Sequence, residues 1–474
     1  MLSKDELDAI YTTALYLLEK VGINIEDEEI IKLLTDKGCD IGPNKIVYIP
    51  EWLVKDCLGS TPKGVTLCGR DSKRDIKVGM QRYPYIIPLV AINYFDCISN
   101  TYRAVTKEDV QSFIRLCDYL DTMNGVWILT MMPEFKEMHM FCDYVLGLRN
   151  TTKPVIVITS EPKSIDPTYE LAAEIVGGIN ELRRRPLTIN YCAISPLSWN
   201  RKECAMLKAT AKWGIQPAIS TEAPMGYTGP VTLAGNIAQK MAEFLSADVI
   251  LQLLNKGMPI IWCALHETFD QKTAAVNFAS HGNFVQACAI GQIEKYIGAP
   301  TLSSVIPDSK LLDMQESYEL AFLLLSQILG GSNLMVIIGM DSANAFNNEL
   351  LLLLDDMVIA ARRLLDGIDV NPDTLAAGVI KNVCGKLEKG RRVGHFLDQR
   401  HTLTWYEKEQ QPRRDYVFEK HSREKWMELG SKSFVQRAHE RVEEILKTQK
   451  PEPLPIEIEG KIAEIRKKYR IEHL

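Results

Sequence analysis

Acidic residues follow several of the short apolar runs in this chain. A carboxylate at the end of such a run can attract a cationic ligand or contribute to a metal site. Two of these acids, Glu134 and Glu161, precede stretches of helical period, where a carboxylate also stabilises the positive end of the helix dipole. The full set is Asp96, Glu134, Glu161, Glu222, Glu267, Asp308 and Asp341.

Glu222 and His266 are the candidate catalytic side chains. Glu222 opens the loop 223–230, whose glycines and prolines restrict its shape and which contains Tyr227. His266 directly follows an apolar run and precedes Glu267. The two residues would act as an acid–base pair if they reached a common point. Alternatively, Glu222 opens a structural turn before a long helix, and His266 is a loop residue satisfied by a local hydrogen bond.

Aromatic residues also lie near the ends of the apolar runs. Aromatic rings are most often part of the core, but together with acids they can form a cage for a quaternary ammonium group. Each ring that faces such a cation contributes about 0.5–2 kcal/mol. The sequence predicts a substrate-binding set of Tyr94, Phe95, Tyr191, Tyr227, Trp262 and Asp341.

The order of residues around His266 argues against a zinc site. Side chains alternate along a strand, so Trp262, Ala264 and His266 share one face, and Cys263 lies on the other. The Cys-x-x-His pair therefore does not supply two ligands on one side, although zinc favours both residue types. The other histidines are dispersed along the chain, and we expect no bound metal.

Eight apolar runs of strand length alternate with segments of helical period between residues 83 and 366. Eight successive β-then-α units predict an α/β protein of the closed (β/α)8, or TIM, barrel type. In such a barrel the chemistry lies where strands end, which is where the candidate residues stand. The first run is the least regular, because Pro84 and Pro88 interrupt it. The runs are Tyr85–Phe95, Val126–Met132, Val155–Thr159, Leu187–Ala193, Pro217–Thr221, Ile260–Leu265, Leu302–Ile306 and Leu334–Gly339.

The barrel is predicted to span residues 82–366, with an extension on each side. Residues 1–81 mix short helical and strand patterns, which predict an α+β cap. Residues 367–474 predict a helical extension, which ends in a proline-rich hinge and a charged helix. A tail of this kind packs on its own domain or joins subunits, and we expect a homo-oligomer.

Composition excludes some classes of function. The chain has 474 residues and a net charge of −6 without separate basic and acidic halves, which argues against nucleic-acid binding. Its 11 cysteines include no C-x-x-C pair, a pattern typical of reduced thiols in the cytoplasm. No apolar run reaches the ~18 residues of a membrane span, and no signal peptide is recognised. We therefore expect a cytoplasmic protein without a membrane or nucleic-acid partner.

Several motifs resemble the trimethylamine methyltransferase (MttB-like) superfamily. The most specific is the run Gly229–Gln239, of sequence GPVTLAGNIAQ, and it is followed by Asp308–Gln315, of sequence DSKLLDMQ. Further matches are Ile194–Trp199 upstream and Gly394–Leu397 downstream. The resemblance thus covers nearly the whole chain.

This resemblance implies a barrel enzyme that takes a methyl group from a methylamine-type substrate. The acceptor is Co(I) of a corrinoid, or cobalamin, held by a separate corrinoid protein that docks over the barrel mouth. Founding members of the family carry pyrrolysine at a strand end, expected here near Leu302–Ile306, whereas this chain has only standard residues. The chain therefore resembles the non-pyrrolysine branch, whose members demethylate quaternary amines such as glycine betaine, proline betaine or carnitine.

A quaternary amine suits the predicted site. Its nitrogen leaves as a neutral tertiary amine, so neither a general acid nor a metal is required, and the protein has to orient the substrate and exclude water. The carboxylate of a betaine needs a hydrogen-bond donor, for which His266 or Asn93 is available. Two alternatives stay open: a barrel that binds a betaine without catalysis, and a lyase or hydrolase that acts on a cationic substrate through Glu222 and His266.

Overall fold

Eight parallel strands form the closed barrel that the alternation predicts. They are β6 (Tyr85–Val90), β9 (Val126–Ile128), β10 (Val155–Ile158), β11 (Thr188–Cys192), β13 (Pro217–Thr221), β14 (Ile261–Ala264), β17 (Ser303–Val305) and β18 (Leu334–Ile337). The strands pair in chain order, and β18 pairs with β6. Backbone hydrogen bonds of Trp262 with Pro300 and Leu302 join β14 to the start of β17 and complete the ring. The computed structural model describes residues 2–79, 83–159, 161–185, 187–410 and 417–472.

The first strand contains a proline, as the sequence shows, and is nevertheless central. β6 includes Pro88 and lies between β18 and β9. The predicted run Tyr85–Phe95 is divided, because its second part forms a separate strand, β7 (Asn93–Asp96). β7 pairs with β8 (Thr101–Ala104) and β19 (Ala345–Phe346) in a small sheet beyond the end of β6.

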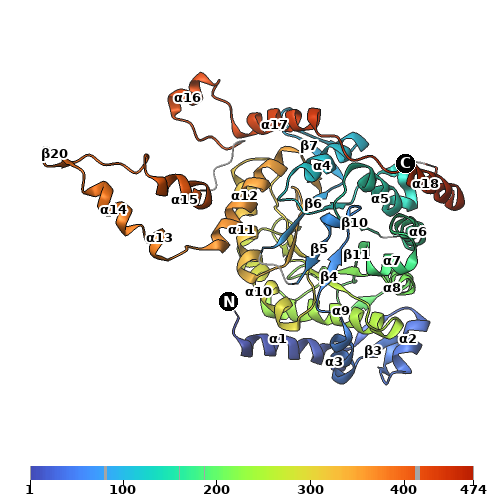
Figure 1. Ribbon diagram of the computed structural model, residues 1–474. Helices are drawn as coiled ribbons and strands as arrows, with labels where there is room; N and C mark the ends of the chain where they lie inside the picture. The colour runs from blue at the N-terminus through green and yellow to red at the C-terminus, as the bar shows by residue number, and fades with distance from the viewer. Residues whose placement is uncertain (1, 80–82, 160, 186, 411–416, 473–474) are drawn as a thin grey trace.

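Helices connect the strands and form the outer layer of the barrel (Figure 1). They are α4 (Lys107–Tyr119), α5 (His139–Asn150), α6 (Ile165–Val176), α7 (Ile179–Arg184), α8 (Arg201–Trp213), α9 (Leu233–Leu254), α10 (His281–Ile297), α11 (Met314–Gly330) and α12 (Glu349–Asp366). Parallel strands require such crossover connections, and the apolar run Leu350–Leu354 is buried in α12. No helix in the described part of the chain has the length and apolar character that a membrane crossing requires.

The N-terminal segment covers α9. Its elements are α1 (Lys4–Tyr16), η1 (Leu17–Val21), β1 (Ile23–Ile25), α2 (Glu28–Thr35), β2 (Asp40–Ile41), β3 (Ile46–Tyr48), α3 (Glu51–Ser60), β4 (Val65–Leu67) and β5 (Ile76–Val78). α1 and α3 pack against α9 at the edge of the barrel (Figure 1). β1 also pairs with β12 (Ser198–Trp199), which lies in the loop after β11. The segment is therefore attached both to the outer layer and to one loop of the barrel.

As a result, α9 is surrounded by protein. Every residue from Asn236 to Gln252 is buried, because the barrel lies on one side and the N-terminal segment on the other. Polar residues within α9 therefore need internal partners. One of them, Asp248, accepts a hydrogen bond from Thr61, whose Oγ1 lies 2.6 Å from Oδ1. Burial raises the pKa of Asp248 to about 6.

Beyond α12 the chain leaves the barrel and later returns to it (Figure 1). The projecting part contains α13 (Pro372–Leu375), α14 (Ala377–Cys384), β20 (Leu387–Glu388), β21 (Arg391–Arg392) and α15 (Arg400–Gln410). The returning part contains α16 (Arg423–Glu428), α17 (Phe434–Thr448) and α18 (Ile456–Tyr469). α17 packs against α12 and α4, and α18 packs against α6.

The contact between Thr61 and Asp248 predicts a stability effect. Substitution of Thr61 by valine keeps the shape but removes a hydrogen bond from a buried carboxyl group, which costs about 1–3 kcal/mol. Urea denaturation should show this loss of unfolding free energy. The matched control is Thr13→Val, because the Thr13 hydroxyl bonds only to Ala9 O of its own helix at an exposed position. Equal stability of both variants would contradict the role of this contact.

Candidate active site

Trp262 shows which side chains of the barrel strands face outward. Its indole ring stacks on Phe244 of α9, with the ring centroids 5.2 Å apart. Its Nε1 donates a hydrogen bond to Thr221 Oγ1 at 3.0 Å, and the residue is fully buried. Since neighbours in a strand alternate, Cys263 points to the barrel interior. The prediction that Trp262 lines a substrate cage is therefore not supported, because its ring belongs to the packing between strand and helix.

Tyr191 has the same orientation as Trp262. The side chain of Tyr191 lies near Thr210 of α8 and Tyr169 of α6, and its hydroxyl has no hydrogen-bond partner among the described residues. Only 1% of Tyr191 is exposed, and burial raises the pKa of its phenol. The side chain thus fills the space between β11 and the outer helices, so we do not retain it as a residue of the mouth.

The polar residues near the start of α9 hold the loops at the barrel mouth. Asn236, Gln239, Lys240 and Glu243 are spaced so that they lie on one face of the helix. α9 follows β13, so its first turns lie at the end of the barrel where the strands terminate. Each of the four side chains bonds to a loop that follows a barrel strand. We call this set the α9 polar face.

The loop after β13 is held by two amides of the α9 polar face. Asn236 Nδ2 donates to Ala223 O at 2.6 Å, and Gln239 Nε2 donates to Thr228 O at 2.9 Å. Gly229 is required between them, because a Cβ atom there would lie 2.3 Å from Asn236 Nδ2. These contacts explain why glycine, asparagine and glutamine occupy positions 229, 236 and 239 of the run Gly229–Gln239.

The loop after β11 is held by Glu243. Its carboxylate accepts hydrogen bonds from Ser195 Oγ at 2.8 Å and from the Leu197 amide at 3.0 Å. The peptide bond between Ser195 and Pro196 is cis. Burial raises the pKa of Glu243, and the hydrogen bonds oppose that shift.

The loop after β14 is held by Lys240. The ammonium group donates to Leu265 O and lies 3.0 Å from Glu267 Oε2, and both side chains are almost completely buried. Burial raises the pKa of Glu267 to about 7, the Lys240 ammonium lowers it, and the charge of Glu222 raises it. Apart from this ion pair, neither oxygen of Glu267 has a hydrogen-bond partner among the described residues. A carboxylate in this position can attract a second cation.

His266 is buried and neutral. Its Nδ1 lies 3.5 Å from Ser304 Oγ on β17, and its Nε2 has no partner in the part of the chain that the structure describes. Burial lowers the pKa of His266 to about 3, and the nearby Lys240 charge acts in the same direction. The imidazole therefore can donate or accept a hydrogen bond at neutral pH but is not a cationic acid.

Glu222 lies at the more open part of the same region. The residue is exposed, and its Oε1 accepts a hydrogen bond from Cys192 Sγ at 3.2 Å. Burial raises the pKa of the Cys192 thiol, and the Glu222 charge raises it further, so that the thiol stays protonated. Because the charge of Glu222 also raises the pKa of Glu267, the two carboxyl groups are close enough to interact.

An aromatic pair forms the rim above these acids. Tyr227 and Phe269 are stacked, with their centroids 5.0 Å apart and their planes at 24°. Backbone hydrogen bonds of Met225 with Glu267 and Phe269 join the two loops that contain these rings. Tyr227 is 70% exposed, so its ring is accessible at the rim. Of the predicted set, Glu222 and Tyr227 thus lie in the loop after β13 and His266 lies in the neighbouring loop after β14.

The remaining predicted residues lie on the other side of the ring of strands. Tyr94 contacts Phe346 edge-on at 5.4 Å, and the guanidinium of Arg103 lies 4.7 Å from the Tyr94 centroid. Phe95 is buried against Tyr102, with centroids 4.9 Å apart. The cation that Tyr94 contacts is thus one from the protein itself.

Asp341 is also paired within the chain. Its Oδ1 lies 2.7 Å from Lys310 Nζ, and its backbone has a φ of 54°. Among the described residues, no group of three or more His, Cys, Asp or Glu side chains is arranged to hold a metal ion. Tyr94, Phe95 and Asp341 therefore form a second cluster, separate from Glu222 and His266.

Lys240 is not among the residues predicted from the sequence, and Glu267 is predicted only as an acid at a strand end. Lys240 stands at helical spacing from Asn236 and Glu243, and three polar residues on one face of a largely apolar helix are a signal of an internal polar face. The strand β14 ends at Ala264, so the alternation of side chains need not continue to His266 and does not by itself place Cys263 and His266 on opposite faces.

The buried pair of Lys240 and Glu267 leads to a test of stability. Lys240→Met leaves an unpaired buried carboxylate and an unbonded carbonyl, which should cost about 3–5 kcal/mol. The double variant Lys240→Met/Glu267→Gln should recover part of this loss, because the uncompensated charge is gone. Thermal unfolding midpoints measured at pH 8 distinguish the two. If the double variant were as unstable as the single one, the pair would not contribute in this way.

Comparison with protein families places the whole chain in one of them. The family model of trimethylamine methyltransferase (MTTB) matches residues 1–471. The trimethylamine methyltransferase MttB of Desulfitobacterium hafniense is 29% identical over 471 residues, which are 98% of this chain and 92% of that protein. The glycine betaine methyltransferase of Desulfitobacterium hafniense is 24% identical over 471 residues, 98% of this chain and 95% of that protein.

A solved structure shows the same fold at low identity. The monomethylamine methyltransferase MtmB of Methanosarcina barkeri has a TM-score of 0.51 and 10% identity, with 94% of this chain and 88% of that chain covered. This similarity supports the barrel fold alone, whereas the family match identifies the class of enzyme. The chain is a methyltransferase that belongs to the trimethylamine methyltransferase family.

Proposed function

We propose that this enzyme demethylates a quaternary amine of the betaine type and passes the methyl group to Co(I) of a separate corrinoid protein. The observation that carries the proposal is the combination of two interacting carboxyl groups, Glu222 and Glu267, with the stacked rings of Tyr227 and Phe269 at the mouth. Relatives named as trimethylamine and glycine betaine methyltransferases support a methylated amine as the substrate.

The charges of this region favour a cation. Glu222 and Glu267 together carry two negative charges when ionised, and Lys240 neutralises one of them. A quaternary ammonium cannot donate a hydrogen bond, so it is held by long-range attraction and by ring faces. Each ring contributes about 0.5–2 kcal/mol to such binding. Tyr227 has an accessible ring, while Tyr94 is already in contact with Arg103.

The neutral state of His266 also suits this reaction. A quaternary nitrogen departs with the bonding electron pair as a neutral tertiary amine, so no proton has to be delivered to it. His266, with its pKa lowered to about 3, is unsuited to deliver one as an imidazolium near neutral pH. Its unpartnered Nε2 can instead carry the N–H that binds the carboxylate of a betaine. The corrinoid supplies the nucleophile, and this chain orients the methyl group and excludes water.

The two alternatives from the sequence are less well supported. A lyase or hydrolase would need Glu222 and His266 to converge on one point. Instead, Glu222 contacts Cys192 of β11, and His266 contacts Ser304 of β17, so the two side chains are directed to different strands. A barrel that only binds a betaine would keep the same acids and rings at the mouth, and only an activity assay separates it from an enzyme. We further infer a cytoplasmic location, which the 11 free cysteines support.

The first experiment is a substrate panel. The purified chain is incubated with cob(I)alamin and, in separate reactions, with glycine betaine, proline betaine, carnitine or trimethylamine. We expect loss of the Co(I) absorbance together with release of the demethylated amine from one or more quaternary substrates and not from trimethylamine. Tight binding without release of a demethylated amine would favour the binding barrel, and turnover without cobalamin would favour the lyase or hydrolase.

The pKa of Glu267 predicts a pH dependence of substrate affinity. As the pH rises through about 7, Glu267 ionises, and calorimetry should show roughly tenfold tighter binding of the active quaternary amine. The same ionisation opposes folding, so that stability falls as the pH rises from the ordinary glutamate pKa towards 7.

The matched variants are Glu267→Gln and Glu203→Gln. Glu267→Gln should bind weakly at every pH, because its side chain cannot ionise. Glu203 also has a pKa raised by burial, but it lies on the outer helix α8, so its substitution should leave the pH dependence intact. A Glu267→Gln variant that retains the full dependence would contradict the assignment.

A further inference from the structure

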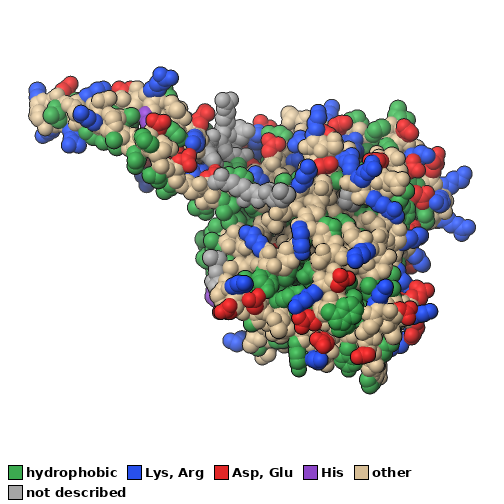
Figure 2. All heavy atoms as spheres, turned by 60° about the horizontal axis from the view of Figure 1, so that its bottom comes forward, with side chains coloured by type: hydrophobic (Ala, Val, Ile, Leu, Met, Phe, Trp, Pro, Cys, Tyr) green, Lys and Arg blue, Asp and Glu red, His purple; other side chains and the backbone are tan. Residues whose placement is uncertain are grey.

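Residues 367–410, here called the arm, project from the barrel without a core of their own (Figures 1 and 2). They leave after α12 and include α13, α14, the β20–β21 hairpin and α15. Val383 is the one arm residue that is buried, although all 44 positions from 367 to 410 are described. Helices as short as α14 are marginal in water on their own, so the arm needs a surface to pack on.

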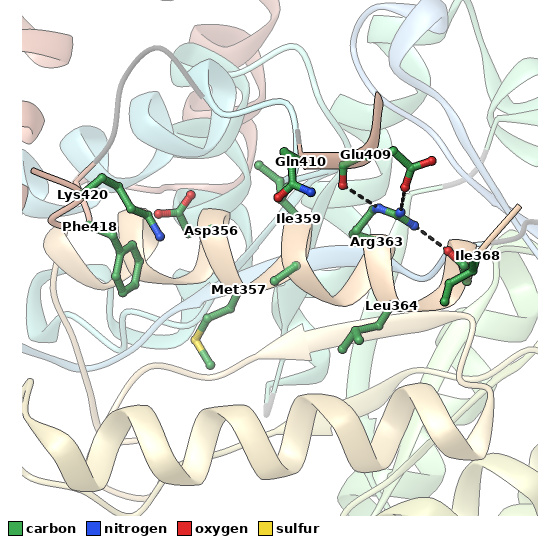
Figure 3. Close-up of a pocket in the computed structure, with 12 residues that line it drawn as sticks. Asp356, Met357, Ile359, Arg363, Leu364, Ile368, Glu409, Gln410, Phe418 and Lys420 are labelled. Atoms are coloured by element: carbon green, nitrogen blue, oxygen red, sulfur yellow. Dashed lines mark hydrogen bonds and ion pairs between the residues drawn. The ribbon is translucent and has the colours of Figure 1, made fainter. Parts of the chain in front are cut away.

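The base of the arm has a defined structure. Arg363 of α12 donates to Gly367 O at 2.7 Å, where the arm begins, and contacts Glu409 Oε2 at 2.5 Å, where it ends (Figure 3). Lys408 and Asp369 form a second bridge between the two ends, with Nζ 3.0 Å from Oδ2. These ion pairs bring the two ends of the arm together and thereby direct it away from the barrel.

Large apolar side chains are exposed along the arm. They are found on its helices and on the connecting segments, and Figure 2 shows them among basic side chains. A monomer does not usually expose so many large apolar side chains on one projecting segment. Such a surface marks an interface. The most exposed are Ile368 85%, Leu397 82%, Leu403 76%, Val370 74%, Leu387 62% and Leu375 60%.

A matching apolar surface lies on the barrel beside the base of the arm. Tyr318, Phe322, Leu325 and Leu329 of α11 are exposed and follow one face of the helix, because they are spaced by four, three and four residues. α11 packs against α12, from which the arm departs. We call this surface the α11 stripe.

A hollow of about 800 Å³ lies at the base of the arm, on α12 (Figure 3). It is lined by apolar groups of Met357, Leu364 and Phe418, by Ile368 at the start of the arm, and by the charged side chains of Asp356, Arg363, Glu409 and Lys420. Leu364 is also 67% exposed, so this lining opens to the surface. The α11 stripe and the apolar side of the hollow lie on two helices that pack together, and we treat them as one receptor surface.

One segment of the arm is basic. Residues 377–400 contain six basic and two acidic side chains, a net charge of +4, whereas the whole arm, with seven basic and six acidic side chains, carries +1. The net charge of the chain is −6, so the remainder of the molecule carries −7. A second copy of the same chain offers both the apolar stripe and the opposite charge that this basic segment requires.

The total surface area agrees with a missing partner. The chain exposes 22160 Å². A compact monomer of 53.5 kDa is expected to expose about 18,000 Å², so this chain carries roughly 4,000 Å² of additional surface. Obligate homodimers bury about 2,000–5,000 Å² in total, which is the same order as this excess.

We propose that the arm of one copy docks on the α11 stripe and the adjoining hollow of a second copy, in a two-fold exchange. In a dimer with two-fold symmetry, each copy docks its own arm on its partner and receives the partner's arm. The apolar surfaces of the arm and of the α11 stripe are therefore covered in both copies. The arm departs from α12, the helix against which α11 packs, so both surfaces lie near the base of the arm. This interface is independent of the reaction proposed above.

The test is the oligomeric state of the full-length chain, measured by sedimentation velocity at micromolar concentration. The wild type should sediment as a dimer or a larger even assembly. Leu397→Asp/Leu403→Asp in the arm and Phe322→Asp/Leu329→Asp in the stripe should each dissociate it at least tenfold more readily. Ile456→Asp is the control, because Ile456 is 92% exposed on α18, away from both surfaces, and the assembly should persist. Circular dichroism checks that each variant is folded.

A mixing experiment separates arm exchange from other arrangements. Equal amounts of the arm variant and the stripe variant should form a mixed dimer, because one intact arm then meets one intact stripe. A monomeric wild type, or variants that stay assembled, would overturn the proposal. Dissociation by the arm variant alone would indicate contact between two arms. Loss of methyl transfer to the corrinoid protein from an arm variant of a monomeric chain would assign the arm to that protein instead.

Discussion

The barrel mouth depends on a polar helix face that is buried on all sides. Four side chains of α9 bind loops after β11, β13 and β14, and all four residues are buried. A buried polar group without a partner costs roughly 1–3 kcal/mol, so each bond both satisfies the helix and restrains a loop. The N-terminal segment makes this arrangement possible, because α1 and α3 cover the outer side of α9.

The same constraint explains the electrostatics of the proposed site. Lys240 is taken out of water by α9, and its charge is balanced by Glu267 and by the carbonyl of Leu265. Its position lowers the pKa of both His266 and Glu267, while burial acts on the two in opposite directions. The neutral imidazole of His266, a hydrogen-bond donor, and the ionisable carboxyl group of Glu267 thus stand next to each other. Both are needed for a ligand that has a positive and a negative end.

Not every acid at a strand end belongs to a binding site. Asp308 accepts hydrogen bonds from the Phe278 and Ala279 amides and from Ser342 Oγ, at 2.8–3.0 Å, and so fixes the loops after β14 and β18. Glu319 accepts from the amides of Asp308 and Ser309. These carboxylates accept hydrogen bonds from loop amides, which lack the backbone carbonyl partners that a helix or a sheet provides. Sequence position alone does not separate them from Glu222 or Glu267, because both kinds follow apolar runs.

The barrel itself could be predicted because an apolar run of strand length followed by a segment of helical period occurs eight times. Pro88 did not exclude β6 from the centre of the sheet, so one doubtful residue did not alter the count. The inward or outward direction of a strand could not be predicted, since alternation separates Trp262 from Cys263 without telling which faces the helices. The stack of Trp262 on Phe244 decides it, and that contact joins distant parts of the chain.

The central claim is that one helix face holds the mouth loops as a connected unit. Hydrogen exchange followed by mass spectrometry in Asn236→Ala tests it, because this change removes the bond to Ala223 O and touches no other loop directly. Met225 and Phe269 join the loops after β13 and β14 through backbone hydrogen bonds. We predict faster exchange in both segments 223–229 and 265–269. Faster exchange confined to 223–229 would show that the loops are restrained independently and would contradict the account.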